Sequence, residues 1–200
     1  MSNNQREYRL FNVKVRSAQE GTIEGYAAVF NTMTDLGWFR EQIAPGAFGD
    51  AIAEKQDVRC LFNHDPNQML GRTKSGTLAL EEDNTGLKFT CSMPDTTIGK
   101  DVYAMIQRGD VDQCSFAFSV VDEEVTYDDN GMATRTVKKC NLFDVSPVTY
   151  PAYPTTSVQA RSIEETGKSL KREEKPVESN SDALALAKAR TRLAEISLNK

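Results

Sequence analysis

The sequence has only one histidine, His64, among its 200 residues, and it lacks the features that mark several large functional classes. No stretch approaches the roughly 20 apolar residues of a membrane-spanning helix, and the polar start MSNNQREYRL has no apolar segment typical of a secretory signal. The formal net charge of −5 comes without any basic block, so there is no electrostatic footprint for nucleic acid. We therefore expect no membrane partner, no nucleic-acid partner and a cytoplasmic location.

The sequence also lacks paired cysteines. Its four cysteines lie 31, 23 and 26 residues apart, and none belongs to a CxxC pair of the kind that binds zinc. In a reducing compartment such cysteines are expected to be free and packed as small apolar side chains. The sequence therefore predicts no metal site, and no cofactor is expected.

The composition allows one hydrophobic core followed by a tail. Of all residues, 39% are hydrophobic, which suffices for one domain, assigned to residues 1–160. Residues 161–182 are charged, contain Pro176 and have little to bury, which predicts a flexible linker. Residues 183–200 are predicted to form an amphipathic helix. That helix is either a docking and self-association element or an exposed tail, and the sequence leaves both open.

Hydrophobic periodicity predicts an α+β domain made mainly of strands. One strand, over residues 58–63, ends at His64-Asp65-Pro66, where proline favours a turn. His64 is therefore expected at the end of a strand. The other expected strands form a hairpin within residues 8–30 and lie over 78–80, 87–92, 113–125, 133–139 and 141–149, with helices over 47–55 and 97–108.

Ser115 is the candidate nucleophile. In the strand that follows Asp112, the period of two places Ser115 on a face with Gln113, Ala117 and Ser119, while Cys114, Phe116 and Phe118 take the other. The phenylalanine face is expected to enter the core, which leaves the Ser115 hydroxyl able to meet solvent or substrate. A Cys114 thiol that points into phenylalanines is a poor nucleophile, because burial raises its pKa.

A serine hydroxyl needs a base that takes its proton, and His64 is the only histidine available. The second nitrogen of that imidazole needs an acceptor, either a carboxylate or a backbone carbonyl. Asp144 is the carboxylate of interest, because it interrupts an otherwise strand-like and largely apolar segment and an unpaired buried charge is costly. Taken singly, each of the three residues also fits an ordinary structural role, such as a turn histidine or an edge aspartate.

Several segments together resemble the prohead proteases of tailed bacteriophages, the serine peptidases of capsid maturation. The resemblance spans roughly residues 25–154 and depends on the order of its blocks, since each block is weak alone. The blocks are GYAAVFN (25–31), EQIAPGAF (41–48), LFNHD (61–65), LGRT (70–73), DVDQCSFAF (110–118) and FDVSPVTYPAYP (143–154).

The resemblance implies an antiparallel β-barrel surrounded by helices, similar to the herpesvirus assemblins. It implies Ser115 as nucleophile and His64 as base. Assemblins use a second histidine as the third member of the catalytic triad. Because this chain has no second histidine, a carboxylate must take that role. Family members often carry glutamate where Asp144 stands, and Asp65 and Asp112 are the fallback candidates. Backbone amides are expected to form the oxyanion hole, with Thr149 and Tyr150 suggested by position.

The resemblance further implies that the enzyme acts inside the immature capsid in the host cytoplasm. Its expected substrates are the scaffold or the scaffolding segment of the major capsid protein, and also the enzyme itself. The 183–200 helix is a candidate for carrying the enzyme into the assembling shell. Two alternatives stay open. One is a non-catalytic capsid-assembly module on the same fold, and the other is a cysteine peptidase that uses Cys114.

Overall fold

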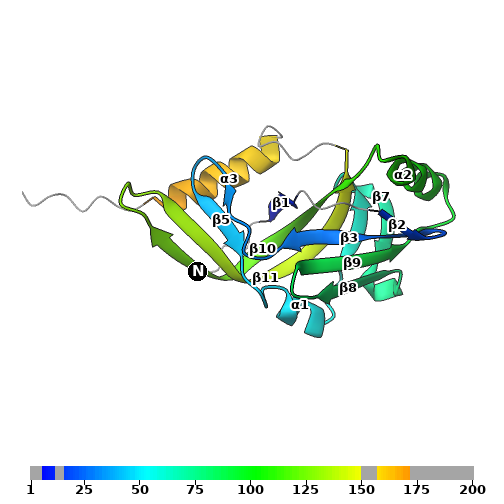
Figure 1. Ribbon diagram of the computed structural model, residues 1–200, viewed down its shortest axis with the longest axis horizontal. Coiled ribbons are helices and arrows are strands. Elements are labelled where there is room, and N and C mark those ends of the chain that lie inside the picture. Colours follow the sequence, from blue (N-terminus) through cyan, green and yellow to red (C-terminus); the bar gives the residue numbers. More distant parts are fainter. Residues whose placement is uncertain (1–5, 12–15, 150–156, 172–200) are drawn as a thin grey trace, which may run out of the picture.

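The computed structural model describes residues 6–11, 16–149 and 157–171, which form two β-sheets and three α-helices (Figure 1). The larger sheet has seven strands and the smaller has four. The larger sheet contains β1 (Glu7–Phe11), β4 (Thr34–Asp35), β5 (Arg40–Ile43), β6 (Arg59–Phe62), β7 (Asp65–Arg72), β10 (Gln113–Tyr127) and β11 (Ala133–Val148). The smaller contains β2 (Arg16–Gln19), β3 (Thr22–Val29), β8 (Leu78–Glu82) and β9 (Gly86–Ser92). The helices are α1 (Gly49–Ala53), α2 (Thr97–Arg108) and α3 (Ser157–Ser169), with a 3₁₀ turn at Thr73–Ser75.

The class expected from the sequence is confirmed as mixed α and β with mostly strands. The strand pairs are mainly antiparallel, but β11 runs parallel to both β5 and β6. The described strands form two separate sheets rather than a closed barrel, so the assemblin-like barrel is not confirmed. In this part of the chain, no helix has the length and apolar character needed to cross a bilayer.

The best-predicted element is α2, whose bounds agree with the expected helix over 97–108. The side chain of Thr96 accepts a hydrogen bond from the Gly99 backbone N–H and so satisfies one free donor of the first turn. Gly109 ends the helix with a φ of 83°, a left-handed conformation that glycine adopts without steric cost. Local capping chemistry thus fixes both ends of this helix.

The expected hairpin within residues 8–30 is present as β2 paired with β3, but the strand that precedes it belongs elsewhere. Residues Glu7–Phe11 form β1, which pairs antiparallel with β10 in the other sheet. The turn expected at Pro66 also differs. The chain reverses at Asn63 and His64, and Pro66 already lies within β7. Proline is tolerated there because β6 is the only described strand that pairs with β7, which leaves β7 an edge strand.

The core lies between the two sheets and is dominated by phenylalanine. One face of β10 contributes Phe116 and Phe118, whose rings stack 4.8 Å apart, and Phe48 meets Phe116 edge to face. The predicted burial of this phenylalanine face is therefore confirmed. All four cysteines are free and buried, as expected from their spacing.

The predicted linker is wrong over its first part, because residues 161–169 belong to α3. Ile163 and Leu170 are buried with Phe39 in a second, smaller apolar cluster that the charged composition did not reveal. Gly167 lets the helix approach Trp38, since a Cβ built there would lie 2.4 Å from the Trp38 Cβ. The remaining part of the predicted linker, 172–182, and the predicted 183–200 helix lie outside the described residues.

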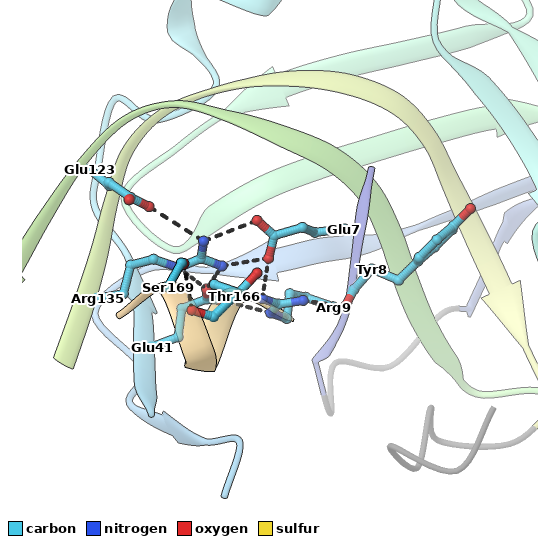
Figure 2. Close-up of polar contacts among 8 residues, drawn as sticks. All are labelled: Glu7, Tyr8, Arg9, Glu41, Glu123, Arg135, Thr166 and Ser169. Carbon is cyan, nitrogen blue, oxygen red and sulfur yellow. Dashed lines mark hydrogen bonds and ion pairs between the residues drawn. The ribbon is translucent and has the colours of Figure 1, made fainter. Parts of the chain in front are cut away.

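A cluster of four buried charges joins β1, β5 and β11 (Figure 2). Arg135 binds Glu7 at 2.5 Å and also binds Glu41, while Arg9 binds the same two carboxylates. Burial by itself would raise the pKa of Glu41, but the charges of Arg9 and Arg135 hold it below its ordinary value of 4.5. Burial likewise opposes the charge of Arg135, yet Glu41 and Glu7 raise its pKa. Glu41 and Arg135 are therefore both charged at neutral pH.

Replacing Glu41 with glutamine is expected to lower the free energy of unfolding by about 3–5 kcal/mol, because two buried guanidinium groups would share one buried carboxylate. Urea unfolding measures this loss. A matched control is Glu24→Gln, which breaks the exposed pair with Arg16 and is expected to cost about 1 kcal/mol or less. The folded pKa of Glu41 is depressed, so its contribution is complete above pH 4.5 and is lost as the pH falls through the folded value. Equal stability of the two variants would contradict this account.

Candidate active site

Three neighbouring strands carry the three residues singled out from the sequence. Ser115 lies on β10, Asp144 on β11, and His64 follows the end of β6. The antiparallel pair β10–β11 sets Ser115 opposite Ser146, and β6 runs parallel to β11 with Arg59 opposite Asp144. Because alternate residues of a strand share a face, Asp144 and Ser146 lie on the same side of the sheet as Ser115. The sheet register thus brings distant parts of the sequence to one place.

The turn that carries His64 has an unusual backbone. Asn63 and His64 both have positive φ angles, 54° and 59°, in the left-handed region that non-glycine residues seldom adopt. The turn is held against β11, because the Asn63 N–H donates to the Pro147 carbonyl at 3.0 Å. The Asn63 side-chain oxygen also accepts a hydrogen bond from the Thr149 N–H at 3.0 Å. Asn63 therefore fixes the position from which the imidazole reaches the sheet.

His64 bridges the other two candidates. Its Nε2 lies 2.7 Å from the Ser115 hydroxyl oxygen, and its Nδ1 lies 2.6 Å from Asp144 Oδ1. The histidine side chain is 19% exposed and that of Asp144 only 3%. A hydroxyl, an imidazole and a buried carboxylate in this order can transfer a proton from the hydroxyl and stabilise the imidazolium that results.

Ser146 supports the carboxylate and was not singled out from the sequence. Its hydroxyl donates a hydrogen bond of 2.7 Å to Asp144 Oδ1, the same oxygen that His64 contacts, and it is fully buried. The Asp-x-Ser spacing contains the signal that could have found it, since residues two apart on a strand share a face. A second hydrogen bond restrains the carboxylate and offsets the cost of burying its charge.

Replacing Ser146 with alanine is expected to lower kcat about tenfold with little change in KM, because a hydrogen bond to a charged group contributes about 1.5–3 kcal/mol. Steady-state kinetics on a chromogenic or fluorogenic peptide measures the effect. Threonine at position 146 keeps the hydroxyl and is expected to restore most of the activity. Ser92→Ala, an exposed serine on β9, serves as the matched control. A Ser146→Ala enzyme with unchanged kcat would contradict this role.

The expected exposure of Ser115 is wrong. Ser115 is fully buried, and so are Ala117 and Ser119 on the same strand. The Ser115 hydroxyl also donates a hydrogen bond to the Arg9 backbone carbonyl on β1 at 3.0 Å. The sequence pattern identified the phenylalanine face correctly, but it did not reveal that the opposite face of β10 would be buried as well.

The other residues considered from the sequence do not join this constellation. Asp65 accepts hydrogen bonds from the backbone and side chain of Asn67, and Asp112 is exposed. Burial raises the pKa of the Cys114 thiol, which keeps it protonated. The Thr149 amide suggested for the oxyanion hole already donates to Asn63. Tyr150 lies outside the described residues.

Comparison with known proteins gives the context of this geometry. The profile of a family described as caudovirus prohead serine protease matches residues 10–169. The chain is 31% identical over 145 residues to the prohead protease of Enterobacteria phage HK97, an alignment that covers 71% of this chain and 60% of that protein. The structure of the bacteriophage T4 capsid assembly protease aligns over 72% of this chain and 97% of that one, with 11% identity and a TM-score of 0.48. From the extent of the family match, the chain belongs to the caudovirus prohead serine proteases.

Proposed function

We propose that this protein is a serine endopeptidase in which Ser115, His64 and Asp144 form the catalytic triad. The observation that carries the proposal is the pair of short contacts from one imidazole, 2.7 Å to Ser115 Oγ and 2.6 Å to Asp144 Oδ1. Family membership supports it independently of the geometry.

The mechanism follows from the roles of these groups. Ser115 Oγ attacks the scissile carbonyl carbon while His64 Nε2 takes the hydroxyl proton, and Asp144 orients the ring and offsets its positive charge. His64 then gives the proton to the leaving amine, which breaks the peptide bond and leaves an acyl ester on Ser115. A water molecule, deprotonated by the same base, hydrolyses that ester. In each addition step a negative charge develops on the carbonyl oxygen, and nearby backbone amides have to stabilise it.

The proposed substrates are the scaffold or the scaffolding segment of the major capsid protein, and the protease itself. The proposed place of action is the interior of the immature capsid in the host cytoplasm. We also propose that the fold is similar to that of the herpesvirus assemblins. The aligned region spans 60% of the HK97 prohead protease, so activity and partners of the whole protein are proposed here from the site and the family together.

Coexpression with the cognate major capsid protein tests this function. The wild-type chain is expected to shorten the capsid protein, and mass spectrometry of the product locates the cleaved bond. Ser115→Ala and His64→Ala are both expected to leave it intact. Cleavage that persists in both variants would reject the triad, and binding without cleavage by the wild-type chain would favour the non-catalytic assembly module.

A cysteine peptidase that uses Cys114 is disfavoured. The pKa of this thiol is raised by burial, and its side chain enters the phenylalanine core rather than the side of the sheet that carries His64. Loss of cleavage after Cys114→Ala, with unchanged thermal stability, would revive this alternative.

A further inference from the structure

The strand β1 fills the edge of β10 next to Ser115. β1 lies at the end of the strand order β1-β10-β11-β5-β4, so β10 is its one described neighbour within the sheet. Their antiparallel register sets Leu10 opposite Ser115 and Arg9 opposite Phe116. Figure 2 shows this short strand beside the long curved strands of the sheet. A peptide that binds by adding a strand to this edge would need the same place.

With β1 in this place, Ser115 is not ready for attack. The hydroxyl has one proton, and the Arg9 carbonyl accepts it at 3.0 Å in competition with His64 Nε2. Ser115 is 0% exposed, so no external carbonyl reaches it. The Tyr8 ring also packs edge-on against the His64 ring, with centroids 4.8 Å apart. The backbone of β1 therefore lies directly against the Ser115 hydroxyl, in the place that a peptide paired with this edge of β10 would take.

Two charged side chains of β1 hold it there. Glu7 and Arg9 are two residues apart and thus project to the same face of the strand. Glu7 accepts hydrogen bonds from Arg135 at 2.5 and 3.0 Å, and Arg9 donates to Glu41 (Figure 2). Glu41 and Arg135 come from β5 and β11, which form the body of the sheet. Glu41 and Arg135 thus present one negative and one positive charge to any strand that pairs with this edge of β10.

We propose that this edge of β10 is the substrate-binding site, and that it accepts an extended peptide with an acidic residue two positions before a basic one. Arg135 recognises the acidic side chain and Glu41 the basic one, while β1 is an internal ligand that substrate displaces. This inference rests on the proposed function, because it names the substrate class of the Ser115 site.

The charge balance explains why β1 can leave. Without Glu7 and Arg9, Arg135 Nε still donates to Glu41 Oε2 at 2.7 Å, so the two receptor charges remain paired. A peptide with acidic and basic residues in this order restores the four-charge cluster. The reverse order places like charges together in a buried site, which is costly. The specificity of the site therefore depends on the order of the acidic and the basic residue in the peptide.

Loosening β1 is the first test. In the double variant Glu7→Gln/Arg9→Gln, the rate at which a fluorophosphonate probe labels Ser115 is expected to rise about fivefold or more, as a weakening by 1–2 kcal/mol implies. Arg16→Gln/Glu24→Gln removes an exposed ion pair on the other sheet and is expected to change nothing. A slower rate in a folded double variant would overturn the proposal, because β1 would then complete the site.

Peptide binding is the second test, and it does not depend on catalysis. Fluorescence anisotropy compares fluorescein-labelled REYRLF, the sequence of residues 6–11, with the charge-reversed peptide RRYELF. The double variant is expected to bind REYRLF about tenfold more tightly than RRYELF. The wild-type chain is expected to show the same order of affinity with weaker binding, which keeps the test available if the double variant unfolds.

Equal affinity for the two peptides, or no binding of either, would overturn the proposed recognition. Failure of the fluorophosphonate to label Ser115 in every variant would instead reject the proposed function. The two failures are therefore distinguishable.

Discussion

Replacing Ser115 with alanine is expected to lower kcat for peptide hydrolysis on the order of 10⁵- to 10⁶-fold, because no acyl ester can form without the hydroxyl. The protein is expected to remain folded, since alanine fits the volume of the buried serine. The single hydroxyl proton, for which His64 and the Arg9 carbonyl compete, supplies one hydrogen bond, and its loss costs about 1 kcal/mol. Single-turnover kinetics with a fluorogenic peptide measures the effect, and thermal unfolding confirms the fold.

Ser119 offers a matched control on the same strand. It is buried like Ser115, but its hydroxyl has no hydrogen-bond partner among the described residues. Ser119→Ala is therefore expected to keep wild-type kcat. Equal losses in the two variants would indicate a general disturbance of β10 rather than the loss of a nucleophile.

Replacing Asp144 with asparagine has the second-largest expected effect, a fall in kcat of about 10⁴-fold with a small change in KM. The carboxylate accepts the Nδ1 proton of His64 at 2.6 Å and the Ser146 hydroxyl proton at 2.7 Å. An amide in its place is neutral, so it neither fixes the required tautomer nor stabilises the imidazolium. Steady-state kinetics separates this loss of kcat from a change in KM.

The two fallback carboxylates serve as controls for this prediction. Asp65 shapes the turn after His64 through Asn67, and Asp112 is exposed before β10. Asp65→Asn and Asp112→Asn are expected to keep kcat within a few-fold of the wild type. A 10⁴-fold loss in either one, with an active Asp144→Asn enzyme, would transfer the third role to that residue.

The sequence predicted what local chemistry determines. The bounds of α2 follow from Thr96 and Gly109, and the phenylalanine face of β10 follows from its period of two. Residue chemistry and the order of the matching blocks also predict that Ser115, His64 and Asp144 act together. The structure brings these three side chains together.

The missed features depend on contacts between distant residues. Arg135 was unremarkable in a polar strand, yet it is buried because Glu7 and Glu41 from far along the chain neutralise it. Residues 161–169 looked like a linker because their charged side chains hide the apolar face that Ile163 presents to Phe39. The pairing of β1 with β10 joins residues about a hundred positions apart, and no local pattern predicts such a pairing.

Labelling with a fluorophosphonate, followed by tandem mass spectrometry of the digested protein, tests the central claim most directly. The account predicts one phosphonyl group per chain, attached to Ser115, with labelling absent in Ser115→Ala and strongly slowed in His64→Ala. Stoichiometric labelling of another residue, or labelling of Ser115 at the same rate without His64, would contradict the catalytic role proposed for these residues.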